Sequence, residues 1–383
     1  MKFSTKQVHA GCEPDPITGA ILPPIYQTTT YVQPSVDGYL SKGYSYSRSG
    51  NPTVRALERR LAALENGADC AAFSTGMAAI QAVMMALLNG GDHCIVSDVA
   101  YGGTYRFATK VLSRFGVEFT FADTSDPRSV ESGLRANTRL IFTETPANPT
   151  MKLTDIAAIS DIARRRGIPH AVDNTFLTPY YQRPLELGAD LVVHSTTKYL
   201  DGHNATVGGA VVSRTKEFDA SVRFMQNAAG IIMSPFVAWL TLQGCKTLSV
   251  RMDRQSASAL AVARRLEAHP KVAEVRYPGL ESFAQHELAR RQASGFGAML
   301  WFEVRGGLPA GKRLMDAIRV WSLAENLGSV ESLVTHPVTM THADVDPAER
   351  KRVGITDGLV RLSVGLEDES DLIGALEEAL ERV

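Results

Sequence analysis

The sequence has little of what marks secreted, membrane-bound or strongly charged proteins. It contains four cysteines in 383 residues and no C-x-x-C pair, so we expect no disulfide framework and a reducing, cytoplasmic setting. Its first residues lack the apolar stretch of a signal peptide, and no apolar run approaches the ~20 residues needed to span a bilayer. The formal net charge is −1, and no basic or acidic run indicates a nucleic acid or a membrane surface as a partner.

Signatures of nucleotide and metal binding are also lacking. No G-x-G-x-x-G follows the first predicted strand, which argues against a dinucleotide oxidoreductase. The stretch 306–312 spells most of a P-loop, but Arg313 stands where the Mg²⁺-binding Ser or Thr would be. No histidine or cysteine spacing suits a zinc site, so we expect no metal.

What the chain does contain is an organisation in three parts. Residues 1–55 are rich in Pro, Gly, Tyr, Thr and Ser and are typical of an irregular arm, which usually forms a functional loop or packs on a partner. Residues 56–250 alternate apolar strands with helical patterns, which predicts a large domain with a mostly parallel sheet and helices on both faces. Residues 251–383 are expected to form a smaller C-terminal α/β domain.

The expected elements follow from the spacing of apolar residues. In the large domain the predicted strands are 70–74, 93–97, 119–122, 139–143, 168–173, 190–194 and 207–213, and the predicted helices are 75–88, 103–115, 127–135 and 154–166. In the C-terminal domain we expect helices at 256–269 and 368–382, with strands at 272–277, 298–304, 320–324 and 359–364.

A lysine and an aspartate follow two of these strands. The strand 190–194 leads through three hydroxyl residues to Lys198, and the strand 168–173 ends in Asp173. Taken alone, Lys198 would be a surface lysine and Asp173 a loop cap. Together they would lie at the edge where parallel sheets bind ligands. A lysine there can hold an aldehyde cofactor as a Schiff base, and a carboxylate can keep a pyridine nitrogen protonated so that the ring accepts electrons.

Three further segments suit a flat, phosphorylated cofactor. Gly76 and Met77 open a helix after the first strand of the sheet, where backbone N–H groups form an anion site. Tyr101 follows the next strand and could stack on a ring. Arg48, in the arm, could clamp a phosphate. Each also has an ordinary explanation: a strand-to-helix turn, a half-buried tyrosine and a solvated arginine.

In this order, the segments resemble the pyridoxal-phosphate (PLP)-dependent Cys/Met-metabolism family, the trans-sulfuration enzymes. The resemblance covers nearly the whole chain. Its motifs are Pro-Pro-Ile-Tyr at 23–26, Tyr-Ser-Arg-Ser-Gly-Asn-Pro-Thr at 46–53, Glu-Thr-Pro-Ala-Asn-Pro at 144–149, Val-Asp-Asn-Thr-Phe at 172–176, His-Ser-Thr-Thr-Lys-Tyr at 194–199, Ser-Gly-Phe-Gly-Ala-Met-Leu at 294–300 and Val-Arg-Leu-Ser-Val-Gly-Leu-Glu-Asp at 360–368.

The resemblance implies an aspartate-aminotransferase-like (type I PLP) fold and a homotetramer, a dimer of dimers. It implies that Lys198 is the Schiff-base lysine and general base, that Asp173 pairs with the pyridine nitrogen and that Tyr101 stacks on the ring. The other implied cofactor-binding residues are Gly76, Met77, Thr175, Ser195 and Thr197, with Tyr46 and Arg48 reaching the phosphate of a neighbouring subunit. The implied substrate-binding residues are Asn148, Glu325, Asn326 and Arg361.

The implied activity is that of a carbon–sulfur lyase or synthase acting on cystathionine or an activated homoserine by γ-elimination or γ-replacement. Glu325 and the sequence Tyr101-Gly102-Gly103 look most like cystathionine γ-synthase and γ-lyase. Ser45 departs from that pattern, because an acid that can meet the distal ammonium of cystathionine usually stands there; Asn326 and Asn204-Ala205 depart as well. An O-acylhomoserine sulfhydrylase, a broad cysteine/cystathionine β-lyase and a catalytically inactive binding homologue therefore stay open.

Overall fold

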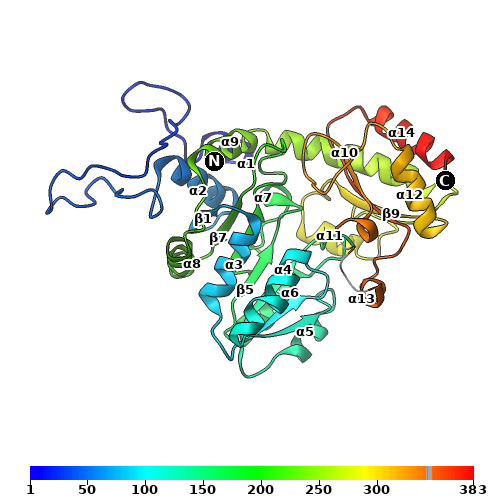
Figure 1. Ribbon diagram of the computed structural model, residues 1–383, viewed down its shortest axis with the longest axis horizontal. Coiled ribbons are helices and arrows are strands. Elements are labelled where there is room, and N and C mark those ends of the chain that lie inside the picture. The colour runs from blue at the N-terminus through cyan, green and yellow to red at the C-terminus, as the bar shows by residue number, and fades with distance from the viewer. Residues whose placement is uncertain (342, 344–346) are drawn as a thin grey trace.

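Two β-sheets lie side by side in the chain, each flanked by helices (Figure 1). The computed structural model describes residues 1–341, 343 and 347–383. The larger sheet has the order β1-β7-β6-β5-β4-β2-β3 and the smaller the order β10-β11-β12-β9-β8. The strands are β1 Asp69–Phe73, β2 His93–Ser97, β3 Glu118–Ala122, β4 Thr138–Glu144, β5 His170–Asp173, β6 Leu191–Ser195, β7 Gly209–Ser213, β8 Val272–Arg276, β9 Met299–Val304, β10 Ser322–Leu323, β11 Leu333–Thr335 and β12 Leu359–Ser363.

The helices connect and cover these strands. They are α1 Phe3–His9, α2 Pro52–Glu65, α3 Gly76–Leu87, α4 Gly102–Lys110, α5 Pro127–Gly133, α6 Ile156–Arg165, α7 Thr178–Tyr181, α8 Lys216–Ala229, α9 Pro235–Cys245, α10 Leu248–Glu267, α11 His286–Gln292, α12 Gly307–Ala317, α13 Pro347–Arg352 and α14 Glu369–Glu381, with 3-10 turns η1 Leu112–Phe115 and η2 Pro337–Thr339. In the described chain no helix is long and apolar enough to cross a membrane.

The larger sheet is mostly parallel, as predicted. Strands β2 to β6 pair in parallel, whereas β7 is antiparallel to both of its neighbours, β1 and β6. No crossover helix lies between β6 and β7, so the chain returns directly through the loop 196–208 and the pairing is antiparallel. That loop carries Lys198 and leaves the sheet at the carboxyl end of β6.

Both faces of the larger sheet are covered, because successive side chains of a strand point to opposite sides. Ala71 and Phe73 belong to one buried cluster with residues of α3, and Cys70 and Ala72 belong to the other with residues of α2, α9 and α10. The predicted two-sided burial is therefore confirmed. It leaves the strand ends as the place where polar side chains reach an open space.

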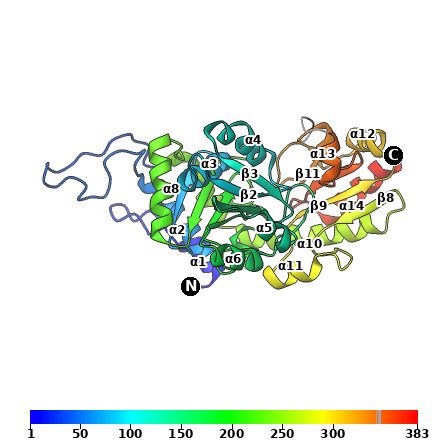
Figure 2. The ribbon, with the colours of Figure 1, turned by 90° about the horizontal axis from the view of Figure 1, so that it is seen from below.

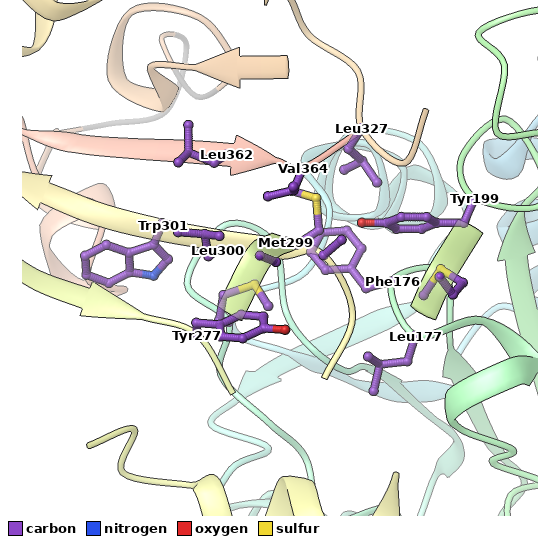
Figure 3. Close-up of a cluster of buried hydrophobic side chains, with 14 of the residues drawn as sticks. Phe176, Leu177, Tyr199, Tyr277, Met299, Leu300, Trp301, Leu327, Leu362 and Val364 are labelled. Carbon is purple, nitrogen blue, oxygen red and sulfur yellow. The ribbon is translucent and has the colours of Figure 1, made fainter. Parts of the chain in front are cut away.

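The second sheet is joined to the first by one continuous apolar core. Helix α10 runs along both units (Figure 1), and Figure 3 shows Phe176, Leu177 and Tyr199 from the first unit facing Met299 and Leu300 of β9. All five side chains are buried. Because this core is shared, residues of the second sheet are held in fixed positions over the strand ends of the first.

The N-terminal segment is less irregular than the sequence predicts. Residues 3–9 form α1, and Gln7 donates a hydrogen bond to the Ser249 hydroxyl at 2.8 Å. The buried Arg60 guanidinium donates to the carbonyl of Ala10 at 3.0 Å. A helix of two turns is too short to show a period in the sequence. Only the chain beyond it projects from the body, as Figure 1 shows.

Several other elements differ from the sequence-based expectation, among them α7, α8, α11, α13 and β11, which were not predicted. The helix predicted over 103–115 is α4 followed by the 3-10 turn η1, and α9 was not predicted at all. Helix α9, with the sequence PFVAWLTLQGC, is apolar almost all round. It therefore lacks the one-sided pattern by which a surface helix is recognised.

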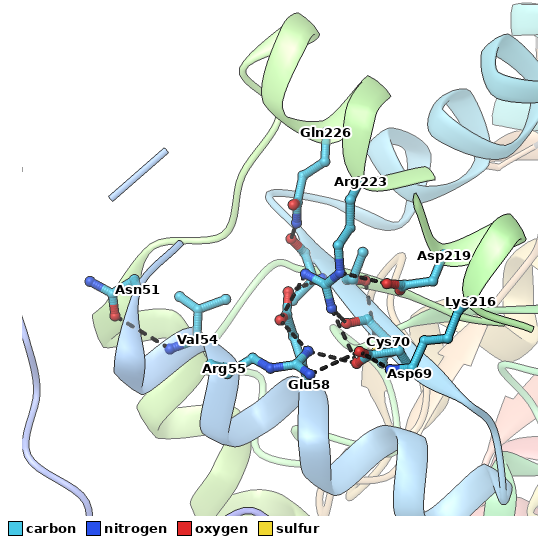
Figure 4. Close-up of polar contacts among 12 residues, drawn as sticks. Asn51, Val54, Arg55, Glu58, Asp69, Cys70, Lys216, Asp219, Arg223 and Gln226 are labelled. Atoms are coloured by element: carbon cyan, nitrogen blue, oxygen red, sulfur yellow. Dashed lines mark hydrogen bonds and ion pairs between the residues drawn. The ribbon is translucent and has the colours of Figure 1, made fainter. Parts of the chain in front are cut away.

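An ionic cluster with buried carboxylates joins α2, β1 and α8 (Figure 4). Its members are Arg55, Glu58, Asp69, Lys216, Asp219 and Arg223. Glu58 also accepts the Ala72 N–H at 3.0 Å. Burial alone would raise the pKa of Asp69, but hydrogen bonds from Arg55 and Lys216 outweigh it and hold that pKa below its usual value. The cluster thus anchors the edge strand β1 by charge as well as by packing.

We predict that Glu58→Ala destabilises the fold by about 2 kcal/mol, because it leaves the buried Ala72 N–H without an acceptor and takes one of several carboxylates from Arg55 and Arg223. Denaturant unfolding measures the loss. The control is Asp161→Ala, which removes the exposed partner of Arg164 and should cost less than about 1 kcal/mol. Equal losses in the two variants would show that the ionic cluster contributes no more than a surface pair.

Candidate active site

A cavity of about 520 Å³ lies where the strand ends of the first sheet meet residues of the second unit. Its lining contains most of the predicted site residues, namely Gly76, Met77, Tyr101, Asn148, Asp173, Thr175, Ser195, Thr197, Lys198, Glu325 and Arg361. The first and last of them in the sequence, Gly76 and Arg361, are 285 positions apart.

Strand register brings the central residues together. Glu144 is paired with Asp173 across β4 and β5, and Asp173 is paired with Val193 across β5 and β6. Ser195 lies two residues beyond Val193, and Lys198 follows in the β6–β7 loop. Parallel strands therefore bring two carboxylates and a lysine to one edge.

Asp173 has one oxygen committed and one free. Its Oδ1 accepts hydrogen bonds from the backbone N–H and the hydroxyl of Thr175, at 3.0 and 2.6 Å. The Thr175 hydroxyl in turn accepts the Ser195 N–H at 2.9 Å, so it holds the carboxylate in place. No described group hydrogen-bonds to Oδ2. Burial raises the pKa of Asp173. A cationic partner beside its free oxygen would stabilise the charged carboxylate.

Lys198 is held by an amide. Its Nζ donates to Oδ1 of Asn326 at 2.5 Å, and Nδ2 of Asn326 donates to Oδ1 of Asn204, also at 2.5 Å. Burial, followed by the nearby positive charge of Arg361, lowers the pKa of Lys198 to about 8. The amine is therefore neutral, and able to act as a nucleophile or base, far more often than an exposed lysine.

Arg361 is a buried cation with an unused donor. Its Nη1 donates to Oδ1 of Asn148 at 3.0 Å, and its Nη2 to the Asn326 carbonyl and the Thr335 hydroxyl, both at 3.1 Å. Nε is buried and has no partner in the described chain, where no carboxylate forms a salt bridge with this guanidinium. Burial lowers the pKa of Arg361 to about 10. A ligand carboxylate would satisfy both the orphan donor and the charge.

The first turn of α3 offers backbone donors. Thr75 caps the helix by accepting the Ala78 N–H at 2.9 Å, while the N–H groups of Gly76 and Met77 precede the first intrahelical acceptor. A Cβ on Gly76 would lie 2.9 Å from Cβ of Ser195, so only glycine lets the turn approach β6 this closely. The turn is thus shaped as an anion site beside a serine.

The ring of Tyr101 projects over the cavity at the start of α4, where its side chain is 46% exposed. A Cβ on Gly103 would come within 2.5 Å of both the Tyr101 ring and Sδ of Met77. Glycine at 103 therefore leaves room for the ring to lie where it does. The Thr197 hydroxyl is engaged with the backbone of Gly208, accepting its N–H at 3.0 Å.

Three predicted site residues, Tyr46, Arg48 and Asn326, do not line this cavity within one chain. Tyr46 and Arg48 lie on the projecting arm, where the Arg48 guanidinium stacks 5.2 Å from the Tyr46 ring and donates to Asn227. Ser45 lies on the same arm. Asn326 contacts Lys198 but is not part of the lining, and both ends of its amide are occupied.

Sequence reasoning missed Glu144. This residue lines the cavity, is 6% exposed and ends the strand next to β5. The rule that singled out Asp173, a carboxylate at the carboxyl end of a predicted strand, applies equally to Glu144 and would have found it.

The residues of the cavity fit PLP. The phosphate would be held by the α3 N-terminus and Ser195, the aldehyde by Lys198 and the pyridine nitrogen by Oδ2 of Asp173, with the Tyr101 ring beside the cofactor ring. The unsatisfied Nε of Arg361 would remain for the carboxylate of an amino acid. The free oxygen of Asp173 and the unpaired Nε of Arg361 thus each have a counterpart in this cofactor or in such a substrate.

Comparisons with known proteins agree over the full length. The profile of the Cys/Met metabolism PLP-dependent enzymes matches residues 4–381. The cystathionine gamma-lyase of Bacillus subtilis (strain 168) is 47% identical over 383 residues, covering 100% of both chains. The cystathionine gamma-synthase of Mycobacterium tuberculosis (strain ATCC 25618 / H37Rv) is 48% identical over 377 residues, 98% of this chain and 96% of its own.

A solved structure gives the same result. The crystal structure of metB from Corynebacterium glutamicum matches with a TM-score of 0.96 at 45% identity, covering 100% of this chain and 98% of that one. The predicted fold class, an aspartate-aminotransferase-like α/β fold, is confirmed.

The lowered pKa of Lys198 predicts a pH dependence for covalent attachment of PLP to the apoprotein. Only the neutral amine attacks, so below pH 8 the rate should rise about tenfold per pH unit, and above pH 8 it should level off. Borohydride trapping followed by mass spectrometry of the Lys198 peptide measures the rate of attachment. The same reaction with Nα-acetyl-lysine, which keeps a free ε-amine, is the reference for the titration of PLP itself. A rate that keeps rising to pH 10 would show that Lys198 titrates as an ordinary lysine.

Proposed function

The chain belongs to the Cys/Met-metabolism family of PLP-dependent enzymes, and from that premise we propose that it breaks or exchanges the bond at the γ-carbon of cystathionine or of an activated homoserine. PLP is the proposed cofactor, attached to Lys198. When bound, it would accept the electrons left at the substrate α-carbon by proton removal. The remaining tasks fall to side chains of the chain itself.

Lys198 is proposed to move the proton. Lys198 lines the cavity and the pKa of its amine is lowered to about 8, so it can take a proton at neutral to mildly basic pH and return it. The hydrogen bond to Asn326 gives the free amine a fixed resting position. Removal of a γ-substituent requires a proton to be taken first from the α-carbon and then from the β-carbon, and a single flexible lysine can reach both.

Asp173 and Arg361 are proposed to fix the two ends of the bound molecules. Oδ2 of Asp173 would keep the ring nitrogen protonated, because its partner oxygen is already held by Thr175. Arg361, oriented by Asn148, would bind the substrate α-carboxylate through its open Nε. The substrate side chain would then extend toward Glu325, the exposed acid of the lining.

The observation that carries this proposal is the meeting of Lys198, Asp173 and Arg361 in one cavity. It does not separate a lyase from a synthase, because both begin with the same proton removal. The relatives named above include one of each at nearly equal identity. The presence or absence of an incoming thiol would decide which product forms.

The arm, the assembly and the domain division complete the proposal. We infer that residues 1–55 include the arm, with 56–250 as the cofactor domain and 251–383 as the C-terminal domain. Several apolar side chains of the arm are exposed in the single chain, which supports burial against a partner: Ile17, Ile21, Val32 and Val36 are 82–92% exposed. We propose a homotetramer in which Tyr46 and Arg48 complete the neighbour's phosphate site. The four free cysteines support a cytoplasmic location.

The first test of the function is a product assay with cystathionine, cysteine, methionine and O-acetyl- and O-succinylhomoserine, each with and without an added thiol. We expect 2-oxobutyrate from cystathionine or an acylhomoserine alone, and a new thioether when a thiol is added, because both arise at the γ-carbon. Pyruvate as the only product would indicate β-elimination instead. No product from any of them, with PLP bound, would identify a catalytically inactive binding homologue.

The second test concerns the arm and uses two damaged variants. Lys198→Ala and Arg48→Ala should each be nearly inactive alone. If the arm completes a neighbour's site, a hybrid dimer has one site with both lysine and arginine intact, and an equal mixture should recover about a quarter of wild-type activity. Co-expression with two affinity tags yields the hybrids, and each unmixed variant is the control. No recovery would mean that Arg48 serves its own chain or none.

A further inference from the structure

Glu144 stands at the centre of the candidate site with no role in the proposal above. It is the last residue of β4, directly across from Asp173 of β5, and it is 6% exposed. Its backbone N–H donates to the Ser97 hydroxyl at 3.2 Å, so the main chain at this point is fixed as well. A carboxylate buried at such a place needs partners, because an unpaired buried charge is costly.

The partners of the Glu144 carboxylate are two backbone N–H groups from different loops. Oε2 accepts the Tyr101 N–H at 2.7 Å, and Oε1 accepts the Asn148 N–H at 3.0 Å. Tyr101 is the N-cap residue of α4, and Asn148 lies in a turn flanked by Pro146 and Pro149, which have no N–H to donate. Each oxygen therefore serves one donor, and both loops are tied to the end of β4.

Each of these loops carries a side chain that faces the cavity. The Tyr101 ring projects over it, and the Asn148 amide oxygen accepts from the Arg361 guanidinium at 3.0 Å. The Glu144 carboxylate thereby sets the spacing between the Tyr101 ring and the Asn148–Arg361 pair. A carboxyl group offers one oxygen to each of the two donors, whereas a glutamine would present one acceptor and turn an N–H₂ group toward the other donor.

Burial and charge act against the ionised form of Glu144, and its two backbone donors favour that form. Burial and the neighbouring negative charge of Asp173 raise the pKa of Glu144 to about 8, while the two backbone hydrogen bonds act in the opposite direction.

We propose that Glu144 is a positioning residue of the active site, which anchors the Tyr101 loop and the Asn148 loop to the end of β4 through its two carboxylate oxygens. The roles of Tyr101 and Asn148 in binding rest on the proposed function. The anchoring is a property of the chain alone and can be measured without cofactor or substrate.

The test is amide hydrogen exchange of the apoprotein in Glu144→Gln. The variant keeps the volume of the side chain but loses one acceptor, so exchange in the segments 98–106 and 145–152 should accelerate about tenfold in at least one of them. Unchanged exchange in both segments would overturn the proposal. The matched control is Glu367→Gln, in which the original carboxylate also accepts a backbone N–H, that of Ser332, but does not line the cavity. Acceleration of the same two segments in this control would likewise overturn it.

Glu144→Asp serves as the conservative variant, because it keeps both oxygens and the charge. Its exchange should lie between that of the wild type and that of Glu144→Gln. If Glu144→Gln fails to fold, the comparison of Glu144→Asp with the wild type decides: faster exchange confined to the two segments is expected, and exchange that is unchanged or equally faster throughout the protein contradicts the anchoring.

Steady-state kinetics then separates positioning from a merely structural role. In the PLP-loaded enzyme, Glu144→Gln should raise KM for the amino acid about tenfold while lowering kcat by less, because the loosened Asn148 no longer orients Arg361. A proportionate loss of kcat with an unchanged KM would contradict this. If no amino acid is turned over at all, the proposed function fails, but the exchange measurement still decides whether Glu144 anchors the two loops.

Discussion

The parallel pairing of β4, β5 and β6 is the constraint on which the site depends. It places Glu144, Asp173 and Ser195 at one edge in fixed register, and the short return from β6 to β7 adds Lys198. Because these strands are buried on both faces, none can slip without exposing its apolar side chains. The shared core of Figure 3 then fixes the second unit over this edge, so that Arg361 meets the strand ends of another sheet.

In the described chain the cavity residues Lys198, Arg361, Asp173 and Glu144 form no ion pairs with one another. Lys198 and Arg361 have no carboxylate within hydrogen-bond reach in the described chain, and Asp173 and Glu144 accept only from backbone or hydroxyl groups. These side chains stay without a partner of opposite charge until a ligand binds. A cofactor with a cationic ring nitrogen and an amino acid with a carboxylate supply both signs at once.

The site residues at the strand ends could be predicted from the sequence, but the hydrogen bonds between neighbouring strands and loops could not. Lys198 and Asp173 could be found because a residue after a buried strand has only one edge at which to lie. The anchoring by Glu144 could not, because its donors are backbone N–H groups, which every residue but proline carries and which no letter of the sequence distinguishes. Substrate binding by Asn326 stays a prediction; the hydrogen bonds of its amide with Lys198 and Asn204 could not be read from a sequence pattern. Helix α9 was not predicted because it is apolar on nearly all sides and so lacks the one-sided pattern of a surface helix.

The placement of the four cysteines bears on the chemistry of sulfur itself. None lines the cavity, and burial raises the pKa values of Cys70, Cys94 and Cys245, the last to about 11. Cys12, the one partly exposed thiol, accepts a hydrogen bond from the Arg60 guanidinium and does not line the cavity. A thiol or disulfide that enters as substrate or leaves as product therefore meets no protein sulfur with which it could exchange. The site can handle reactive sulfur compounds without being trapped as a mixed disulfide.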